Sequence, residues 1–145
     1  LNGKNISGLI RTPEMSRGAS AVSAIPGVRT ALLNMQRHHA TLGGVVMEGR
    51  DIGTVVVPDA EAKFFVTASS EVRARRRYDE LRARGVATTL EATLAEVVAR
   101  DDADAGRDVA PLVPAADAEL VDTSTMPIDG VVEHLVARVR GLTAR

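Results

Sequence analysis

Cysteine and tryptophan are both absent from the 145 residues, and lysine occurs only at positions 4 and 63. Without cysteine the chain can form no disulfide, thiol nucleophile or cysteine-ligated zinc site, and a cytoplasmic location is the default expectation. The only aromatic residues are Phe64, Phe65 and Tyr78, which argues against a protein that stacks single-stranded bases. No window approaches the ~18 consecutive apolar residues of a membrane span, so we expect no membrane association.

A strong net charge is also missing, because 18 basic residues face 19 acidic ones and leave a formal charge of −1. Such a chain has no global field for nucleic acid, so any anion site must be local. All the basic residues other than Lys4 and Lys63 are arginine, whose planar guanidinium holds phosphate or carboxylate with two parallel hydrogen bonds. A genomic bias toward arginine codons explains the same composition.

Helix-start and helix-stop signals divide the chain into five predicted helices. The first is capped by Thr12 and opened by Pro13, and the second runs from about 28 to 39 after a break at Pro26–Gly27. The third is capped by Ser69 or Ser70 and ended by Gly85. The fourth is capped by Thr88 and runs to about Ala105, and the last is opened by Pro127.

Three short apolar runs, at 45–47, 63–67 and 118–122, read as buried strands alternating with these helices. Strands separated by helices indicate an α/β fold with a parallel sheet covered on both faces.

The residues just past the first predicted strand, Glu48-Gly49-Arg50-Asp51-Ile52-Gly53-Thr54, lie where open α/β sheets bind their ligands. Arg50 offers a fork for phosphate and Asp51 offers acceptors for an amino group or hydroxyl. Glycines allow a ligand to approach the backbone. The plainer alternative is a turn in which Arg50 and Asp51 pair with each other.

A second constellation, Arg100, Asp104 and Arg107, has the spacing that places side chains on one helix face. The apolar, proline-containing segment 109–114 would hold the end of that helix against the protein. The alternative is a solvated ladder of charge pairs with neighbouring aspartates.

A third constellation is the arginine-rich helix over 71–84, which could close over a polyphosphate. An RNA-binding helix is the competing interpretation, but interleaved aromatic residues are missing. Adjacent His38 and His39 cannot form a metal pair with i, i+4 spacing, and we expect the chain to build no metal site.

Three segments taken together resemble bacterial cytidylate kinases: 48–56, 100–107 and 110–118. The resemblance extends over essentially the whole chain and includes 7–14 and the pair Ser20 and Arg29. It implies a P-loop nucleoside monophosphate kinase fold, with three of its strands in this chain. The implied reaction moves the γ-phosphoryl group of ATP, with Mg²⁺, to CMP or dCMP.

The resemblance also implies roles for single residues. Ser20, Arg29 and Asp51 would recognise cytosine, with Asp51 accepting from the exocyclic amine. Arg50 and Arg107 would hold the CMP phosphate, and Asp104 with Arg100 would position the ribose. One of three neighbouring lid arginines would approach the transferring phosphate, with Arg107 as a further catalytic candidate; the lid candidates are Arg75, Arg76 and Arg77.

The same resemblance divides the chain into the carboxyl-terminal part of a CMP-binding insertion (1–40), core (41–70), lid (71–87) and core (88–145), in a protein expected to be a monomer. The chain departs from the family in having no G-x-x-x-x-G-K-[ST] motif. It therefore looks like the carboxyl-terminal two-thirds of the enzyme, and we expect these residues alone to be inactive. A CMP-binding module without catalysis, or a kinase for UMP or AMP, are the alternatives.

Overall fold

The computed structural model describes residues 1–10, 12–106 and 112–143, which form two compact units, Leu1–Val46 and Met47–Arg145. The first contains the helices α1 (Pro13–Ser23) and α2 (Pro26–Thr41). The second contains, in chain order, the π-helical turn η1 (Ile52–Val56), β1 (Phe64–Thr67), α3 (Ser70–Ala83), α4 (Leu90–Ala105), β2 (Glu119–Asp122) and α5 (Ile128–Thr143). No helix in the described ranges is long and apolar enough to cross a bilayer.

The two helices of the first unit begin at local sequence signals. Thr12 caps α1 as predicted, because its hydroxyl accepts a hydrogen bond from the amide of Met15 at 3.2 Å. The break between the helices falls at 24–25, two residues earlier than predicted. Pro26 is the first residue of α2 rather than its interruption, because the fixed φ of proline suits the first helical position.

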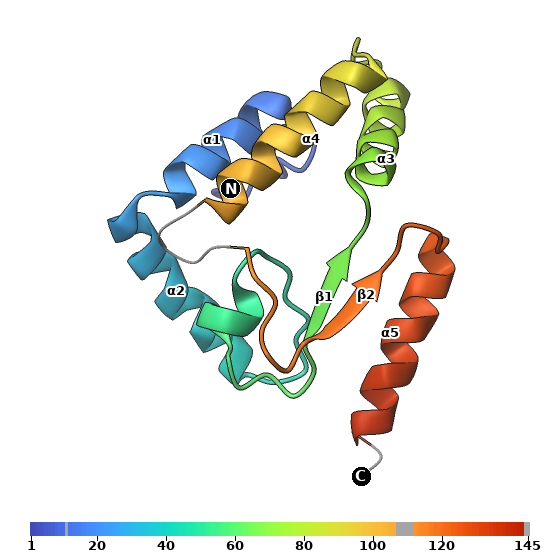
Figure 1. Ribbon diagram of the computed structural model, residues 1–145. Coiled ribbons are helices and arrows are strands. Elements are labelled where there is room, and N and C mark those ends of the chain that lie inside the picture. The colour runs from blue at the N-terminus through green and yellow to red at the C-terminus, as the bar shows by residue number, and fades with distance from the viewer. Residues whose placement is uncertain (11, 107–111, 144–145) are drawn as a thin grey trace. The chain divides into compact units, whose positions relative to one another are not determined.

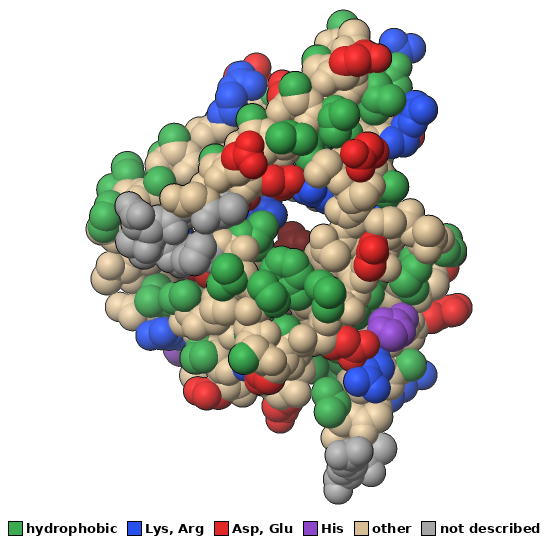
Figure 2. Space-filling view, in the orientation of Figure 1, with side chains coloured by type: hydrophobic (Ala, Val, Ile, Leu, Met, Phe, Trp, Pro, Cys, Tyr) green, Lys and Arg blue, Asp and Glu red, His purple; other side chains and the backbone are tan. Residues whose placement is uncertain are grey.

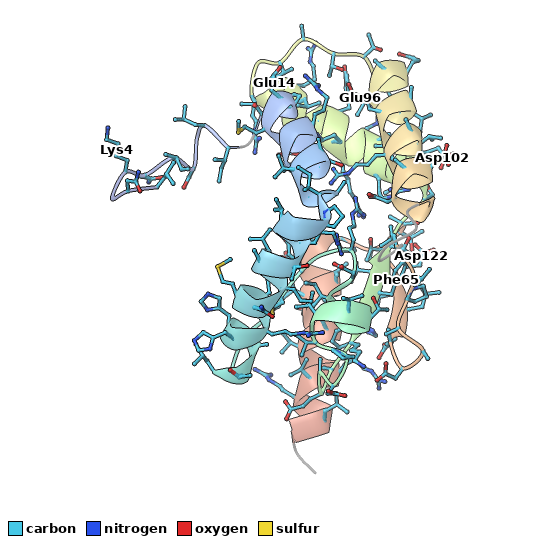
Figure 3. The ribbon with its side chains drawn as sticks, turned by 90° about the vertical axis from the view of Figure 1, so that its left-hand side faces the viewer. Lys4, Glu14, Phe65, Glu96, Asp102 and Asp122 are labelled. Atoms are coloured by element: carbon cyan, nitrogen blue, oxygen red, sulfur yellow. The ribbon has the colours of Figure 1, made fainter. Side chains whose placement is uncertain are left out.

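Two parallel strands form the sheet of the second unit (Figure 1). Phe64 of β1 is opposite Glu119 of β2, and the ladder continues with the amide of Thr123 donating to the carbonyl of Thr67 at 2.8 Å. A parallel pair needs a long crossover, which α3 and α4 supply. In Figure 3, Asp122 marks the carboxyl end of β2 and Phe65 lies on β1.

The strand predicted at 45–47 is wrong. These residues have no regular structure, and Val46 is fully exposed. A strand requires a neighbouring strand to receive its backbone hydrogen bonds, and within the described ranges β1 and β2 pair only with each other. The sheet described here therefore has two strands rather than three, while the prediction of strands at 63–67 and 118–122 is confirmed.

Helices α3 and α4 form a hairpin and lie side by side (Figure 1). Gly85, at φ +74°, ends α3 as predicted, with its amide bonded to the carbonyl of Arg82 and that of Val86 to Leu81. These two bonds are the Schellman pattern, which satisfies the last carbonyls of a helix. Thr89, not Thr88, caps α4 through a 3.1 Å hydrogen bond from Ala92.

Helix α5 is joined to the start of β2 by a charged cluster. The Glu119 carboxylate lies 2.6 Å from Arg138 Nε and 2.9 Å from His134 Nε2. The hydrogen bonds from Arg138 and His134 hold the pKa of the Glu119 carboxyl below its usual range. Figure 2 shows acidic, basic and histidine side chains gathered over this helix. The charged side chains of this cluster therefore lie at the amino end of β2.

Candidate functional site

The loop that carries Arg50 and Asp51 is held by the backbone carbonyl of Asp51. That carbonyl accepts hydrogen bonds from the amides of Val55 at 2.9 Å and Val56 at 3.2 Å, and the Thr54 hydroxyl lies 3.4 Å away. The bond across five residues makes η1 a π-helical turn, a rare form that is frequent at functional sites. The backbone from which both half-buried side chains branch is therefore fixed.

The two glycines of this loop lie close to neighbouring side chains. A Cβ on Gly49 would lie 2.8 Å from Cγ1 of Ile52, and one on Gly53 would lie 3.3 Å from Cδ of Lys63. The sequence suggested that these glycines leave room for a ligand. The structure supplies a different reason, because neighbouring side chains already occupy the space that a Cβ would need.

Asp104 is the buried charge of the second unit, with its side chain only 2% exposed. Its Oδ2 atom lies 3.0 Å from a terminal guanidinium nitrogen of Arg50 and 3.9 Å from Nε of Arg100. The side chains of Arg50 and Arg100 are 36% and 59% exposed, so both are partly accessible to solvent. A buried carboxylate needs such partners, because an uncompensated buried charge is strongly destabilising.

This geometry bears on the structural alternatives that the sequence left open. Arg50 bonds across the fold to α4, so it is more than a member of a local turn pair. Asp104 is buried rather than part of a solvated ladder, and neighbouring Asp101 pairs with Arg73 on another helix. The carboxylate of Asp102, by contrast, projects from α4 into solvent (Figure 3).

Arg107, predicted to bind phosphate, lies outside the described residues, as does the first part of the apolar segment 109–114. Just before 107–111, the amide of Gly106 bonds to the carbonyl of Asp102 at 2.9 Å. Just after 107–111, the amide of Leu112 bonds to the carbonyl of Asp104 at 3.2 Å. Leu112 thus meets the end of α4, while the part of the prediction that concerns 109–111 lies outside the described residues.

The first arginine of α3 fastens the two helices of the hairpin together. Arg73 donates to both carboxylate oxygens of Asp101 at 2.8 and 2.6 Å, and its Nε donates to the carbonyl of Ala68 at 2.9 Å. The hydrogen bonds from Arg73 lower the pKa of Asp101, and the charges of Arg50 and Arg100 act in the same direction. Asp101 is therefore ionised and paired at neutral pH.

The three predicted lid arginines have different environments. Arg76 donates to the Thr123 hydroxyl at 3.1 Å and to the Thr123 carbonyl at 2.6 Å, which ties α3 to the end of β2. Arg77 pairs with Glu80 on the same helix at 2.8 Å. The guanidinium carbon of Arg75 lies 6.0 Å from the centre of the Tyr78 ring, at the limit for a cation–π contact. Of the contacts described here, those of Arg76 therefore reach farthest along the chain.

Ser20 and Arg29 belong to the first unit, on α1 and α2 respectively, as the predicted helix break requires. Ser23 connects them: its hydroxyl donates to the Ser20 carbonyl at 3.0 Å, and its carbonyl lies 3.5 Å from an Arg29 guanidinium nitrogen. The structure therefore brings Ser20 and Arg29 into one group and Arg50, Arg100 and Asp104 into another.

Sequence reasoning did not single out Asp101, Thr123 or Lys63. Their partners are 28, 47 and 54 residues away, respectively, and neither periodicity nor a short motif reports such distances. The only signal for Lys63 was its rarity in an arginine-rich chain. Among the described residues, no group of three His, Asp or Glu side chains is arranged to hold a metal ion.

Comparison with known proteins gives one consistent result. The family model described as "Cytidylate kinase" matches residues 1–141. The chain is 52% identical over 139 residues to the cytidylate kinase of Pelotomaculum thermopropionicum, covering 96% of this chain and 62% of that protein. For the cytidylate kinase of Syntrophotalea carbinolica the identity is 54% over 136 residues, covering 94% and 58%. The chain thus spans about three-fifths of the length of these curated relatives.

Proposed function

Because the chain belongs to the cytidylate kinase family, and so has the fold of P-loop nucleoside monophosphate kinases, we propose that it is the acceptor-binding part of a kinase that phosphorylates CMP and dCMP. The γ-phosphoryl group of ATP, brought as its Mg²⁺ complex, is transferred to the acceptor phosphate to give CDP or dCDP and ADP. We further propose that the protein acts in the cytoplasm as a monomer.

The observation that carries this proposal is the buried Asp104 carboxylate beside two partly exposed arginine side chains. Arg50 and Arg100 present donors to solvent, and a forked guanidinium suits a phosphate. Arg50, together with Arg107, holds the CMP phosphate. Asp104 and Arg100 orient the ribose, and a ribose hydroxyl gains access to Asp104 when Arg50 turns toward the phosphate.

Cytosine recognition is assigned to Asp51, Ser20 and Arg29. The Asp51 carboxylate accepts a hydrogen bond from the exocyclic amine, while Ser20 and Arg29 bind the O2 and N3 edge of the base. Uracil has a carbonyl in place of that amine, so with UMP the carboxylate would face another acceptor without a proton between them. A buried acceptor left in this way costs about 1–3 kcal/mol, which is a sufficient reason for discrimination.

The helical segment at 71–87 acts as the lid, with 1–40 in the CMP-binding insertion and the remaining residues in the core. Phosphoryl transfer requires charge neutralisation and alignment more than a covalent catalyst. Arg76 would give up two hydrogen bonds to Thr123 in order to reach the phosphate. Arg75 and Arg77 contact Tyr78 and Glu80, each three positions along the same helix, and are therefore expected to reach it first.

The donor side of the reaction is not assigned to these residues. The 145 residues contain no P-loop motif, and the described ones hold no cluster of metal-ligating side chains. We therefore assign no residue of this chain to the Mg²⁺ that accompanies ATP, and the roles proposed above concern the acceptor alone.

The test is ADP release by the full-length protein, supplied with ATP and Mg²⁺ and with CMP, dCMP, UMP or AMP in separate assays. Activity highest with CMP or dCMP supports the proposal. Activity highest with UMP or AMP would overturn the role of Asp51, whereas CMP binding without ADP release would point to a binding module.

A further inference from the structure

Lys63 is the most buried cationic side chain among the ion pairs described, with 8% of its side chain exposed. It stands immediately before β1, and its backbone carbonyl accepts the amide of Glu119 at 2.9 Å, which starts the parallel ladder. Its backbone is thus part of the sheet. Its side chain leaves the sheet for two loops that are distant in sequence.

The first of these loops is the one that carries Arg50 and Asp51. The aliphatic stem of Lys63 fills the space beside Gly53, where a Cβ would come within 3.3 Å of Cδ. The ammonium group donates a hydrogen bond to the carbonyl of Pro58, just after η1. Lys63 therefore contacts the middle of this loop with its stem and its far end with its charge.

The second loop leads from α4 to β2. Lys63 Nζ lies 2.8 and 2.7 Å from the two carboxylate oxygens of Asp117. This hydrogen bonding lowers the pKa of the Asp117 carboxyl, so the pair persists at neutral pH. The same loop contains Leu112, whose amide bonds to the carbonyl of Asp104. One ammonium group is thus shared between the two loops that adjoin Arg50 and Asp104.

We propose that Lys63 is a positioning residue for the acceptor site. From its place at the start of β1, Lys63 holds the Arg50–Asp51 loop and the loop after α4 at a fixed separation. The inference rests on the proposed function. Lys63 touches no reacting group in this role. Its effect reaches CMP through the placement of Arg50, Asp51 and Asp104, and small displacements of binding groups have large effects on rates and affinities.

The experiment uses the full-length protein with Lys63→Met, which keeps the stem and removes the charge. We expect KM for CMP to rise by about tenfold while KM for ATP and kcat change by less than about threefold. Hydrogen exchange should accelerate at amides in both loops, read at Val57, Ala60 and Ala118, which are hydrogen-bonded within them. Lys4→Met, at the only other lysine, is the matched control and should change neither readout.

Asp117→Asn is the milder variant in case Lys63→Met does not fold, because the Asp117 side chain is 67% exposed. It should produce the same pattern with a smaller rise in KM for CMP. Faster exchange with an unchanged KM for CMP would reduce Lys63 to a structural residue and overturn the inference, as would unchanged exchange in both loops. A wild-type protein that does not phosphorylate CMP would instead refute the proposed function, from which the inference starts.

Discussion

The two units hold their polar side chains in different ways. In the first, Ser23 bonds to Ser20 three residues earlier, and Arg29 bonds to Ser23 six residues earlier. In the second, Arg73 reaches Asp101 across 28 residues and Arg76 reaches Thr123 across 47. Long-range bonds of this kind require the whole unit to be folded, whereas short-range bonds require only their own helix pair.

Burial follows the same division. Neither α1 nor α2 contains a buried residue, whereas the buried hydrophobic residues described lie in the second unit: Val56, Ala68, Ala74, Leu81 and Val121. Local stability depends on buried contacts and protected hydrogen bonds. The comparison therefore indicates that Arg50 is part of a rigid framework, while Ser20 and Arg29 lie on a unit that opens more easily.

The largest test compares an ion pair from each unit. Arg50→Gln removes the 3.0 Å ion pair with the buried Asp104 carboxylate and keeps Arg100 at 3.9 Å, and should cost about 3 kcal/mol of unfolding free energy. Adding Asp104→Asn should recover most of that loss, because no buried charge then remains. In the first unit, Arg17→Gln breaks a pair with Glu14 that is about two-thirds exposed on each side, and should cost less than ~0.5 kcal/mol.

Urea unfolding of the wild type, Arg50→Gln, Asp104→Asn and the double variant gives the coupling energy between Arg50 and Asp104. A double variant as unstable as Arg50→Gln alone would show that the loss does not come from the buried carboxylate. Equal losses for Arg50→Gln and Arg17→Gln would remove the difference between the units.

The second test concerns the base. Asp51→Ala in the second unit and Arg29→Ala in the first should each raise KM for CMP by about ten- to a hundredfold, as expected for a hydrogen bond to a charged group, with KM for ATP much less affected. Asp59→Ala, at an exposed position of the same loop, is the control. Steady-state kinetics with each substrate varied in turn measures both constants. Equal rises for CMP and ATP would contradict the assignment to the base.

The third test makes the same small change in each unit. Thr12 caps α1 and Thr89 caps α4 through hydrogen bonds of 3.2 and 3.1 Å. Replacing either by alanine should cost about 1 kcal/mol of helix stability. Thr89→Ala should lower the global urea midpoint, whereas Thr12→Ala should mainly accelerate hydrogen exchange within α1. If Thr12→Ala lowers the global midpoint equally, the first unit unfolds with the second.

The smallest effect is the dependence on pH. Arg73 holds the pKa of Asp101 below its usual value of 3.8, so the stabilising pair is complete above that value and is lost as pH falls through the lowered pKa. Acid titration of stability should therefore be shallower below about pH 4 in Asp101→Asn than in the wild type. The pKa of Glu14 is also lowered, chiefly by a backbone hydrogen bond at its own helix end. Glu14→Gln should leave the global acid transition almost unchanged, and a large change there would argue against the comparison.

Local chemistry predicted most of the elements correctly. Thr12, Gly85 and the Pro127 signal gave helix boundaries, the two strands at 63–67 and 118–122 were found from short apolar runs, and the α/β class is confirmed. The strand at 45–47 was wrong because an apolar run does not reveal whether a neighbouring strand exists. Thr88 and Thr89 both have the chemistry of a cap, and the choice depends on backbone angles that sequence does not report.

The site was predictable in its residue types but not in its partners. The spacing of Arg100 and Asp104 correctly placed them on one helix face, since they lie 3.9 Å apart. That Arg50 would pair with Asp104, and that the Asp104 side chain would be buried, depended on where the tertiary fold places the loop before η1 relative to α4. Such contacts arise from the tertiary fold. The roles assigned to Ser20, Arg29, Asp51 and the lid arginines remain predictions until the kinetic tests are made.

Tyr78 beside Arg75 gives these residues a built-in optical reporter. With one tyrosine and no tryptophan among the 145 residues, their ultraviolet emission comes essentially from a single phenol ring on α3. The guanidinium carbon of Arg75 lies 6.0 Å from the centre of that ring. When Arg75 turns toward a bound anion, this cation moves away from the ring, and the tyrosine emission should change. Motion of the hairpin can thus be followed in a stopped-flow instrument without attaching a dye to a chain that contains no thiol to label.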